Sequence, residues 1–313
     1  MKNVLYFLFI LFAFITMLTT FALPQDKVGL LILAHGGHSS WDETVTQAVK
    51  PLKEKYAVEI AFGMADPKTM QAGINKLEAQ GVNTIVVTQL FISSYSPIIR
   101  QNEYLLGLRD ELADEPMIMD HSGFSHGNNH ADMQNTPNVE LKPLNIKSKI
   151  LLTEPLNDHP LVVEILSERV KELSKSPVKE TVILVAHGPN DEEDNRMWVS
   201  TLDNIADKLR AKYTGTNSFK NIFCMTVRDD AAKEIYEAAK ENLRNIVRQA
   251  SKDGKAIVVP VLLSQGGIEK GIVKRLEGLE YEWSGKTLLP HENITKFIET
   301  SVEGALKTEA AKL

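Results

Sequence analysis

The strongest constraint on the fold of this chain is an internal repeat. Two apolar runs, at residues 28–34 and 181–186, both end in Ala-His-Gly, which places His35 and His187 at matching positions. Further matched pieces follow in the same order in both halves. Because several matches in one shared order are rare by chance, the sequence predicts a duplication. These pieces are 61–66 with 224–229, 81–90 with 254–262, and 156–160 with 288–292.

Each half alternates short apolar runs with amphipathic helices. Runs that are apolar throughout are typical of parallel strands covered on both faces by helices. The sequence therefore predicts an α/β fold of two similar domains, each a mostly parallel sheet flanked by helices. Strands are predicted at 28–34, 58–62, 84–90, 150–152, 182–186, 222–226, 256–263 and 286–289. Helices are predicted at 44–56, 67–80, 161–173, 197–212, 231–252, 271–279 and 294–306.

The domain boundaries follow from the repeat and from a helix-breaking dipeptide. Ser176-Pro177 ends the helix predicted before it, because the residue before a proline avoids the helical conformation. We therefore expect an N-terminal domain at 27–175 and a C-terminal domain at 179–313. The matched pieces lie closer together toward the C-terminus, so the first half contains an insertion, placed near 115–148.

The first residues predict an export signal. A basic start at Lys2 precedes an uncharged apolar run at 4–18, and Ala22 offers a small residue before a polar segment. This order is typical of a secretory signal peptide, here 1–22, of an exported periplasmic or extracytoplasmic protein. The alternative is an uncleaved anchor, since the run approaches the length of a membrane span. In that case this segment is the protein's contact with the membrane.

The composition narrows the chemistry. With Cys224 as its one cysteine, the chain has neither an internal disulfide framework nor a multi-cysteine metal site. A metal must then be held by imidazole and carboxylate groups. The formal net charge of −6 argues against a protein that coats nucleic acid.

The two strand-end histidines are the first candidate functional residues. In open α/β sheets, ligands bind outside the carboxyl ends of the strands. His35 and His187 are predicted at such ends, and each precedes a glycine that allows a tight turn. Imidazole is a common metal ligand and a proton carrier near neutral pH. The alternative is that each histidine caps a turn.

The insertion contains a second group of candidates. His121, His126 and His130 lie in a segment rich in glycine, serine and asparagine, which predicts a loop. Histidine-rich tracts are candidates for metal binding, and imidazole suits Co²⁺, Ni²⁺ and Zn²⁺. The alternative is an ordinary surface loop.

Other repeated polar residues are expected to shape helix starts. Asp66 and the pair Asp229-Asp230 precede predicted helices, where aspartate commonly caps the first turn. His159 and His291 also precede helices, and we expect a structural role for both.

The ordered set of motifs resembles the class II tetrapyrrole chelatases, the sirohydrochlorin cobaltochelatases and ferrochelatases of cobalamin and sirohaem synthesis. The resemblance extends from Val28 to about Leu306, in a duplicated two-domain form. It implies a lyase-class enzyme that inserts a divalent metal, cobalt, iron or nickel, into sirohydrochlorin or a related tetrapyrrole without an organic cofactor. The partners implied are the tetrapyrrole and the metal ion. Arg100 and Arg228 are then expected to pair with the tetrapyrrole carboxylates.

The chain departs from the family in the loops after the strands at 84–90 and 256–263, where the family usually has a second histidine. Glu269 is the nearest substitute in the second half. We therefore expect His35, His187 and Glu269 to be catalytic. The expected metal ligands are His35, His187, His121, His126 and His130.

Two other functions stay open at this point. The first is an exported metal- or tetrapyrrole-binding protein of the same fold without chelatase turnover. The second is a two-domain solute-binding protein, which would cross twice between its halves and would lack a repeated Ala-His-Gly.

Overall fold

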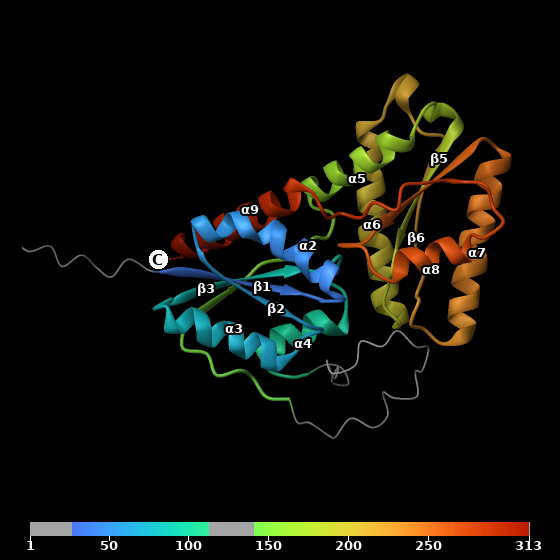
Figure 1. Ribbon diagram of the computed structural model, residues 1–313. Coiled ribbons are helices and arrows are strands. Elements are labelled where there is room, and N and C mark those ends of the chain that lie inside the picture. The colour runs from blue at the N-terminus through green and yellow to red at the C-terminus, as the bar shows by residue number, and fades with distance from the viewer. Residues whose placement is uncertain (1–26, 113–140, 313) are drawn as a thin grey trace, which may run out of the picture.

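The protein contains two parallel four-stranded sheets (Figure 1). A computed structural model describes residues 27–112 and 141–312, so the predicted signal peptide and the three insertion histidines lie outside the described residues. The first sheet has the order β2-β1-β3-β4, with β1 (Val28–Ala34), β2 (Ala57–Phe62), β3 (Thr84–Leu90) and β4 (Lys149–Leu152). The second has the order β6-β5-β7-β8, with β5 (Glu180–Ala186), β6 (Asn221–Thr226), β7 (Lys255–Val261) and β8 (Glu282–Trp283).

Helices connect the strands of both sheets. The first half contains α2 (Ser39–Val49), α3 (Pro67–Ala79), α4 (Pro97–Leu105) and α5 (Pro160–Leu173), with the short 3-10 helices η1 (Lys50–Glu54) and η3 (Pro177–Lys179). The second half contains α6 (Glu192–Lys212), α7 (Lys233–Lys252), α8 (Ile268–Arg275) and α9 (Glu292–Ala310), with the 3-10 helix η4 (Gly215–Asn217). The predicted α/β class with two parallel sheets is confirmed.

The two halves repeat one another in backbone detail. The strand orders are the same, and the connections after β2 and β6 both contain a left-handed residue, Ala65 (φ 55°) and Arg228 (φ 49°). The glycines after His35 and His187 are also left-handed, with φ of 77° at Gly36 and 78° at Gly188. Because left-handed backbone is costly for residues other than glycine, its recurrence at matched positions supports the duplication.

Both faces of each sheet are buried, as the apolar runs predicted. In β1, Leu30 and Ile32 face one core, whereas Leu31 and Leu33 face another. Side chains alternate between the faces of a strand, so a strand covered on both sides is apolar at every position. In Figure 1, α2 and α9 cover one face of the first sheet, and α3 and α4 cover the other. Each half has its own outer core, and one central core joins the two halves.

The last helix of each half lies on the other half's sheet. Helix α5 packs against β7 of the second sheet, and α9 packs against β3 and β4 of the first (Figure 1). The chain thus crosses twice between the halves, after β4 and after β8. Strands β1–β4 precede residues 175–179 and strands β5–β8 follow them, whereas α5 and α9 each pack on the sheet of the other half. We expected two crossings of a solute-binding protein that lacks a repeated Ala-His-Gly. This chain combines two crossings with the repeated motif.

Other element boundaries differ from the prediction in small ways. The last strand lies at Glu282–Trp283 and not at 286–289, because Gly285 turns the chain with a φ of 68°. Leu288 and Leu289 still donate backbone hydrogen bonds to the carbonyls of Leu262 and Leu263, 2.9 and 2.8 Å long. In the first half, residues 106–148 separate α4 from β4, whereas in the second half only residues 276–281 separate α8 from β8.

Glu180 anchors the segment that joins α5 to β5. It is 1% exposed and accepts hydrogen bonds from the Ser174 hydroxyl and from the backbone N–H groups of Lys175 and Ser176. Burial acts to raise the pKa of this carboxyl, but the hydrogen bonds from these donors outweigh it and the pKa is lowered.

Replacing Glu180 with alanine is expected to lower the free energy of unfolding by about 2–4 kcal/mol, because it removes the buried carboxylate that accepts three hydrogen bonds. The lowered pKa means that this contribution is present above the unfolded-state pKa of a glutamate and is lost as pH falls through the folded-state pKa. Urea unfolding at neutral and acidic pH measures both effects. The control Glu237→Gln, on the surface of α7, should change stability by less than about 0.5 kcal/mol. Equal losses in both variants would contradict the role of Glu180.

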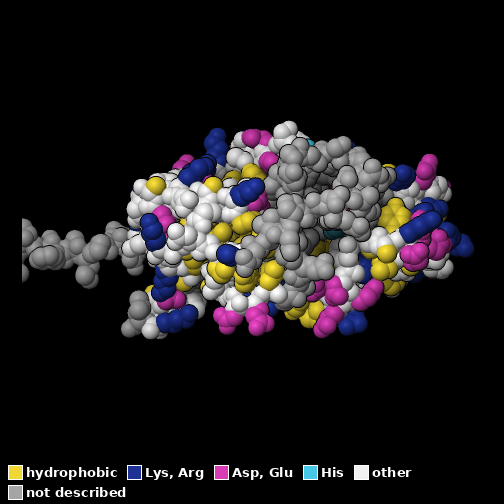
Figure 2. Space-filling model, turned by 90° about the horizontal axis from the view of Figure 1, so that it is seen from below, with side chains coloured by type: hydrophobic (Ala, Val, Ile, Leu, Met, Phe, Trp, Pro, Cys, Tyr) yellow, Lys and Arg dark blue, Asp and Glu magenta, His cyan; other side chains and the backbone are white. Residues whose placement is uncertain are grey.

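The surface is mixed in charge. Figure 2 shows Lys and Arg side chains interspersed with Asp and Glu on the face it draws. Across the described residues, no helix is long and apolar enough to cross a membrane.

Candidate active site

His35 lies at the carboxyl end of β1 with one ring nitrogen fixed. Its Nδ1 lies 2.8 Å from the carbonyl oxygen of Gly36 and donates to it, since a carbonyl can only accept. The Nε2 lone pair is then available, an arrangement typical of histidines that bind metals. Burial lowers the pKa of His35; the bond to Gly36 opposes this, and the nearby His187 ring lowers the pKa further. The lowered pKa favours the neutral form of His35.

His187 lies at the carboxyl end of β5 beside a carboxylate. Its Nε2 is 3.0 Å from Oδ2 of Asp230, close enough for an ion pair but without hydrogen-bond geometry. That nitrogen is buried, whereas the Asp230 side chain is 61% exposed. Asp230 therefore forms one wall of the site around His187.

The capping role predicted for Asp229 and Asp230 is wrong. Helix α7 begins only at Lys233, with Ala232 as its N-cap. Oδ1 of Asp229 instead pairs with the buried Arg275 at 2.6 Å. Asp66 behaves as predicted, since its carboxylate accepts the N–H of Lys68 at 2.8 Å. In the first half a proline follows Asp66, whereas Asp230 follows Asp229, so this connection carries a second carboxylate only in the second half.

The strand-end histidines of the two halves lie close to each other. The pKa of His35 responds to the charges of both His187 and Asp230, which belong to the other half. The Trp41 ring, beside His35, approaches the loop after β7, where a Cβ on Gly266 would lie 3.7 Å from Trp41 Cδ1. The duplicated Ala-His-Gly motifs therefore lie near each other where the two halves meet.

Two polar contacts hold the halves together near this site. Arg100 on α4 makes a bidentate ion pair with Asp194 on α6, at 2.9 and 2.8 Å. The indole N–H of Trp198 on α6 donates to the carbonyl of Tyr95 at 2.5 Å. Bidentate arginine–carboxylate pairs have a well-defined geometry, so these contacts fix α4 and α6 relative to each other.

The arginines expected to meet a tetrapyrrole are engaged within the protein. The guanidinium of Arg100 is shared with Asp194. Arg228 is 6% exposed, pairs with Glu192 at 2.6 Å and donates to the carbonyls of Pro189 and Asn190. Their ion pairs thus position the loops, and the expectation that they bind substrate carboxylates has no support from these contacts.

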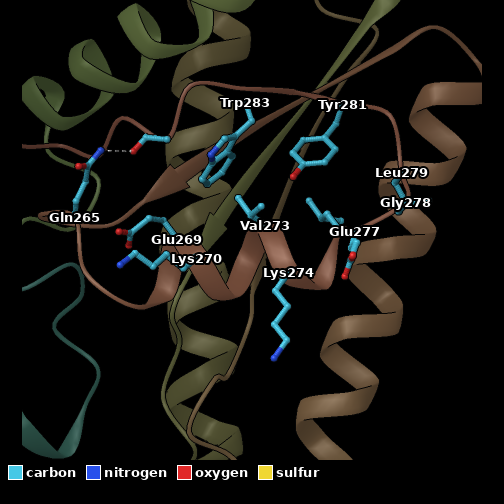
Figure 3. Close-up of a pocket in the computed structure, with 12 residues that line it drawn as sticks. Gln265, Glu269, Lys270, Val273, Lys274, Glu277, Gly278, Leu279, Tyr281 and Trp283 are labelled. Carbon is cyan, nitrogen blue, oxygen red and sulfur yellow. Dashed lines mark hydrogen bonds between the residues drawn. The ribbon is translucent and has the colours of Figure 1, made fainter. Parts of the chain in front are cut away.

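Glu269 lies in the first turn of α8, at one end of a cavity of about 750 Å³ (Figure 3). Its Oε2 is buried without a hydrogen-bond partner. Trp283 and Tyr281 face α8 across this cavity, with Val273 between them. His35 and His187 do not line it, so the cavity does not join Glu269 to the histidine pair.

The metal-ligand set predicted from sequence is only partly testable in the described residues. Within 27–112 and 141–312, no three His, Cys, Asp or Glu side chains form a group that could hold a metal by themselves. His121, His126 and His130 lie outside those ranges. A metal at the histidine pair would thus need further ligands from its substrate, from solvent or from elsewhere in the chain.

His159 and His291 have the structural role that we expected. Each is itself the N-cap: Nδ1 of His159 accepts the N–H of Leu161, and Nδ1 of His291 accepts the N–H of Asn293. Nε2 of His291 also lies 2.9 Å from Glu168 on α5, which links α5 to α9.

Comparisons with known proteins agree with the fold and with the repeat. The CbiX family model matches residues 29–102. A sirohydrochlorin cobaltochelatase of Methanopyrus kandleri is 26% identical over 149 residues, which cover 46% of this chain and 96% of that protein. Another, of Methanothermobacter thermautotrophicus, is 26% identical over 150 residues, covering 47% of this chain and 93% of that protein. Nearly the whole of each relative thus corresponds to less than half of this chain.

A solved structure matches over both halves. SirB from Bacillus subtilis with Fe³⁺ covers 91% of this chain and 98% of its own, with a TM-score of 0.59 and 16% identity. At that identity the similarity shows the fold alone. Both the fold and the sequence matches are thus shared with metal chelatases. In these comparisons the chain is similar to the class II chelatases, and its two sheets fit a duplicated two-domain form of that fold.

Proposed function

We propose that this protein inserts a divalent metal, with Co²⁺ as the first candidate, into sirohydrochlorin or a closely related tetrapyrrole. The observation that carries the proposal is that His35 and His187, one at the same strand end of each half, lie near enough for the charge of His187 to lower the pKa of His35. The cobaltochelatase names of the relatives supply the substrate and the metal. Iron and nickel are the alternative metals.

In this proposal His35 holds the incoming metal. Its Nδ1–H is committed to the carbonyl of Gly36, so Nε2 offers a lone pair without having to lose a proton first. A single neutral ligand binds a divalent ion weakly enough for the metal to pass on to the macrocycle. The metal is here a substrate, and it leaves with the product.

His187 is then the acceptor for the protons that metal insertion displaces. When the ion enters the macrocycle, both pyrrole N–H protons must leave, and a base within reach lowers the barrier. The Asp230 carboxylate, 3.0 Å from Nε2, lies where it can balance the charge of a protonated His187. Glu269, with one buried unpartnered oxygen, is a second candidate acceptor.

Anaerobic incubation of the protein with sirohydrochlorin and Co²⁺ tests this function. The absorption spectrum of the macrocycle should change to that of the metallated form faster than without protein. Ni²⁺ and Fe²⁺ in parallel samples identify the preferred metal. A rate equal to the rate without protein would leave the alternative, a metal- or tetrapyrrole-binding protein that does not turn over.

Asp230→Asn is expected to lower the insertion rate by about tenfold, because partners of functional histidines typically contribute 10–100-fold. Co²⁺ affinity should stay within about twofold of wild type, since His35 holds the metal. Initial rates and equilibrium dialysis measure the two effects. Asp207→Asn, an exposed aspartate on α6, is the matched control and should leave both unchanged. A fall in affinity without a fall in rate would contradict the role of Asp230.

We propose export as well, on the strength of residues 1–22 alone. Expression of the full chain with a C-terminal tag, followed by N-terminal sequencing of the mature protein, tests this. A new N-terminus after Ala22 supports a cleaved signal, whereas an intact Met1 in the membrane fraction supports the anchor.

A further inference from the structure

A second cavity lies between α7 and α8, away from the histidine pair. It has a volume of about 370 Å³, at the lower end for small-molecule sites. Neither strand-end histidine lines it, and neither does Glu269. Its lining is four cationic side chains, one tyrosine and one carboxylate: Lys240, Arg244, Lys274, Arg275, Tyr236 and Glu277.

Arg275 is held rigidly at the base of this cavity. It is 1% exposed, donates to the carbonyl of Val227 at 2.7 Å and pairs with Asp229 at 2.6 Å. Its guanidinium lies 3.8 Å from the ring centroid of Tyr236. Its Nε–H is also buried, and it has no hydrogen-bond partner. A buried N–H without an acceptor is costly. A ligand oxygen that accepts this hydrogen bond would remove that cost.

The other cations come from both helices. Tyr236, Lys240 and Arg244 are four residues apart on α7 and therefore share one face of that helix. Nη1 of Arg244 donates to the carbonyls of Arg275 and Glu277, at 2.6 and 3.0 Å, which fixes its guanidinium at the end of α8.

Lys274 and Lys240 have fewer contacts within the protein than the two arginines. Lys274 has no ion pair with any described residue, and in Figure 3 it extends from α8 away from Tyr281 and Trp283. Lys240 pairs with the exposed Glu237 at 3.0 Å. Surface pairs of this kind are worth at most about 1 kcal/mol, so Lys240 can exchange its partner at low cost.

The four cationic side chains of this cavity have no counterpart on the corresponding helix of the first half. The lysines of α3, the helix that corresponds to α7, are Lys68 and Lys76, and Lys76 already pairs with Glu59 on β2. Like charges gathered around one cavity repel each other unless an anion joins them. These four cationic side chains are therefore not required by the repeated fold.

We propose that this cavity binds a small, multiply charged oxyanion, a phosphoryl or polycarboxylate group. Arginine guanidinium groups present paired N–H donors that match such oxygens, and lysine adds charge. The proposal is independent of the chelatase function, because the cavity shares no residue with the histidine pair.

Isothermal titration calorimetry of the full-length protein tests the proposal with pyrophosphate and with citrate, both at ionic strength balanced with NaCl. We expect saturable binding of at least one of them. The tighter ligand distinguishes phosphoryl from carboxylate chemistry. The double variant Lys240→Ala/Lys274→Ala should weaken that binding at least about tenfold. Arg248→Ala removes a cation from the same helix outside the cavity and should weaken it less than about twofold.

Thermal unfolding of each variant establishes that it is folded, since the two lysines bear no buried contacts. The proposal is overturned if neither anion shows saturable binding up to about 10 mM. It is equally overturned if Arg248→Ala weakens binding as much as the double variant, because the effect would then be one of overall charge.

Discussion

The variant His35→Asn is expected to lower the initial rate of Co²⁺ insertion by at least about 100-fold. Changes to the partners of metal-binding histidines already cost about 10–100-fold, and this change removes the proposed ligand itself. Asparagine retains a polar side chain but not the neutral imidazole whose Nδ1 is held by Gly36. Initial rates from the macrocycle spectrum, with protein and Co²⁺ in fixed amounts, measure the loss.

His159→Asn is the matched control for this variant. It removes an imidazole from a helix N-cap, where asparagine is equally suitable, so both the rate and the stability should be close to wild type. If His35→Asn retains the wild-type rate, His35 is not the metal ligand. If the two variants lose equal activity, the loss is not specific to His35, and the proposed role of His35 is wrong.

Removal of α9 is expected to unfold the first half of the protein as well as the second. Although α9 ends the chain, it packs on β3, β4 and α2 of the first half. Its buried side chains Ile294, Phe297, Ile298 and Val302 are each at most 2% exposed. At about 1.5–3 kcal/mol for each buried side chain, the loss is about 6–12 kcal/mol, comparable to the whole stability of a typical domain.

Limited proteolysis and circular dichroism of a chain ending at Pro290 measure this effect. The control is a chain ending at Lys307, which keeps the buried residues of α9 and should fold. Protease-resistant β1–α4 fragments in the chain ending at Pro290 would contradict the exchange of α9 between the halves.

The sequence predicted the strands better than it predicted how the helices are shared. The runs at 28–34 and 84–90 match β1 and β3 residue for residue, because strands buried on both faces are apolar at every position. An amphipathic pattern shows that α5 and α9 bury one face but not against which sheet. This exchange of helices between the halves depends on tertiary packing, which no local sequence pattern indicates.

The site was likewise predicted only in part. The repeated Ala-His-Gly motifs predicted both strand ends, and the structure brings His35 and His187 together. Asp230 was misassigned because an aspartate near a helix start usually caps it, whereas α7 starts later, at Lys233. The doublet Asp229-Asp230, against aspartate–proline in the first half, was the available signal.

The most direct test of the central claim is a count of turnovers. The protein is mixed anaerobically with an excess of sirohydrochlorin and Co²⁺, and the metallated product is measured against the amount of protein. A chelatase releases its product, so we predict several product molecules per protein molecule, formed well before the reaction without protein advances. Product that stops at one equivalent per protein, or that forms no faster than without protein, would contradict the assignment of chelatase activity to this site.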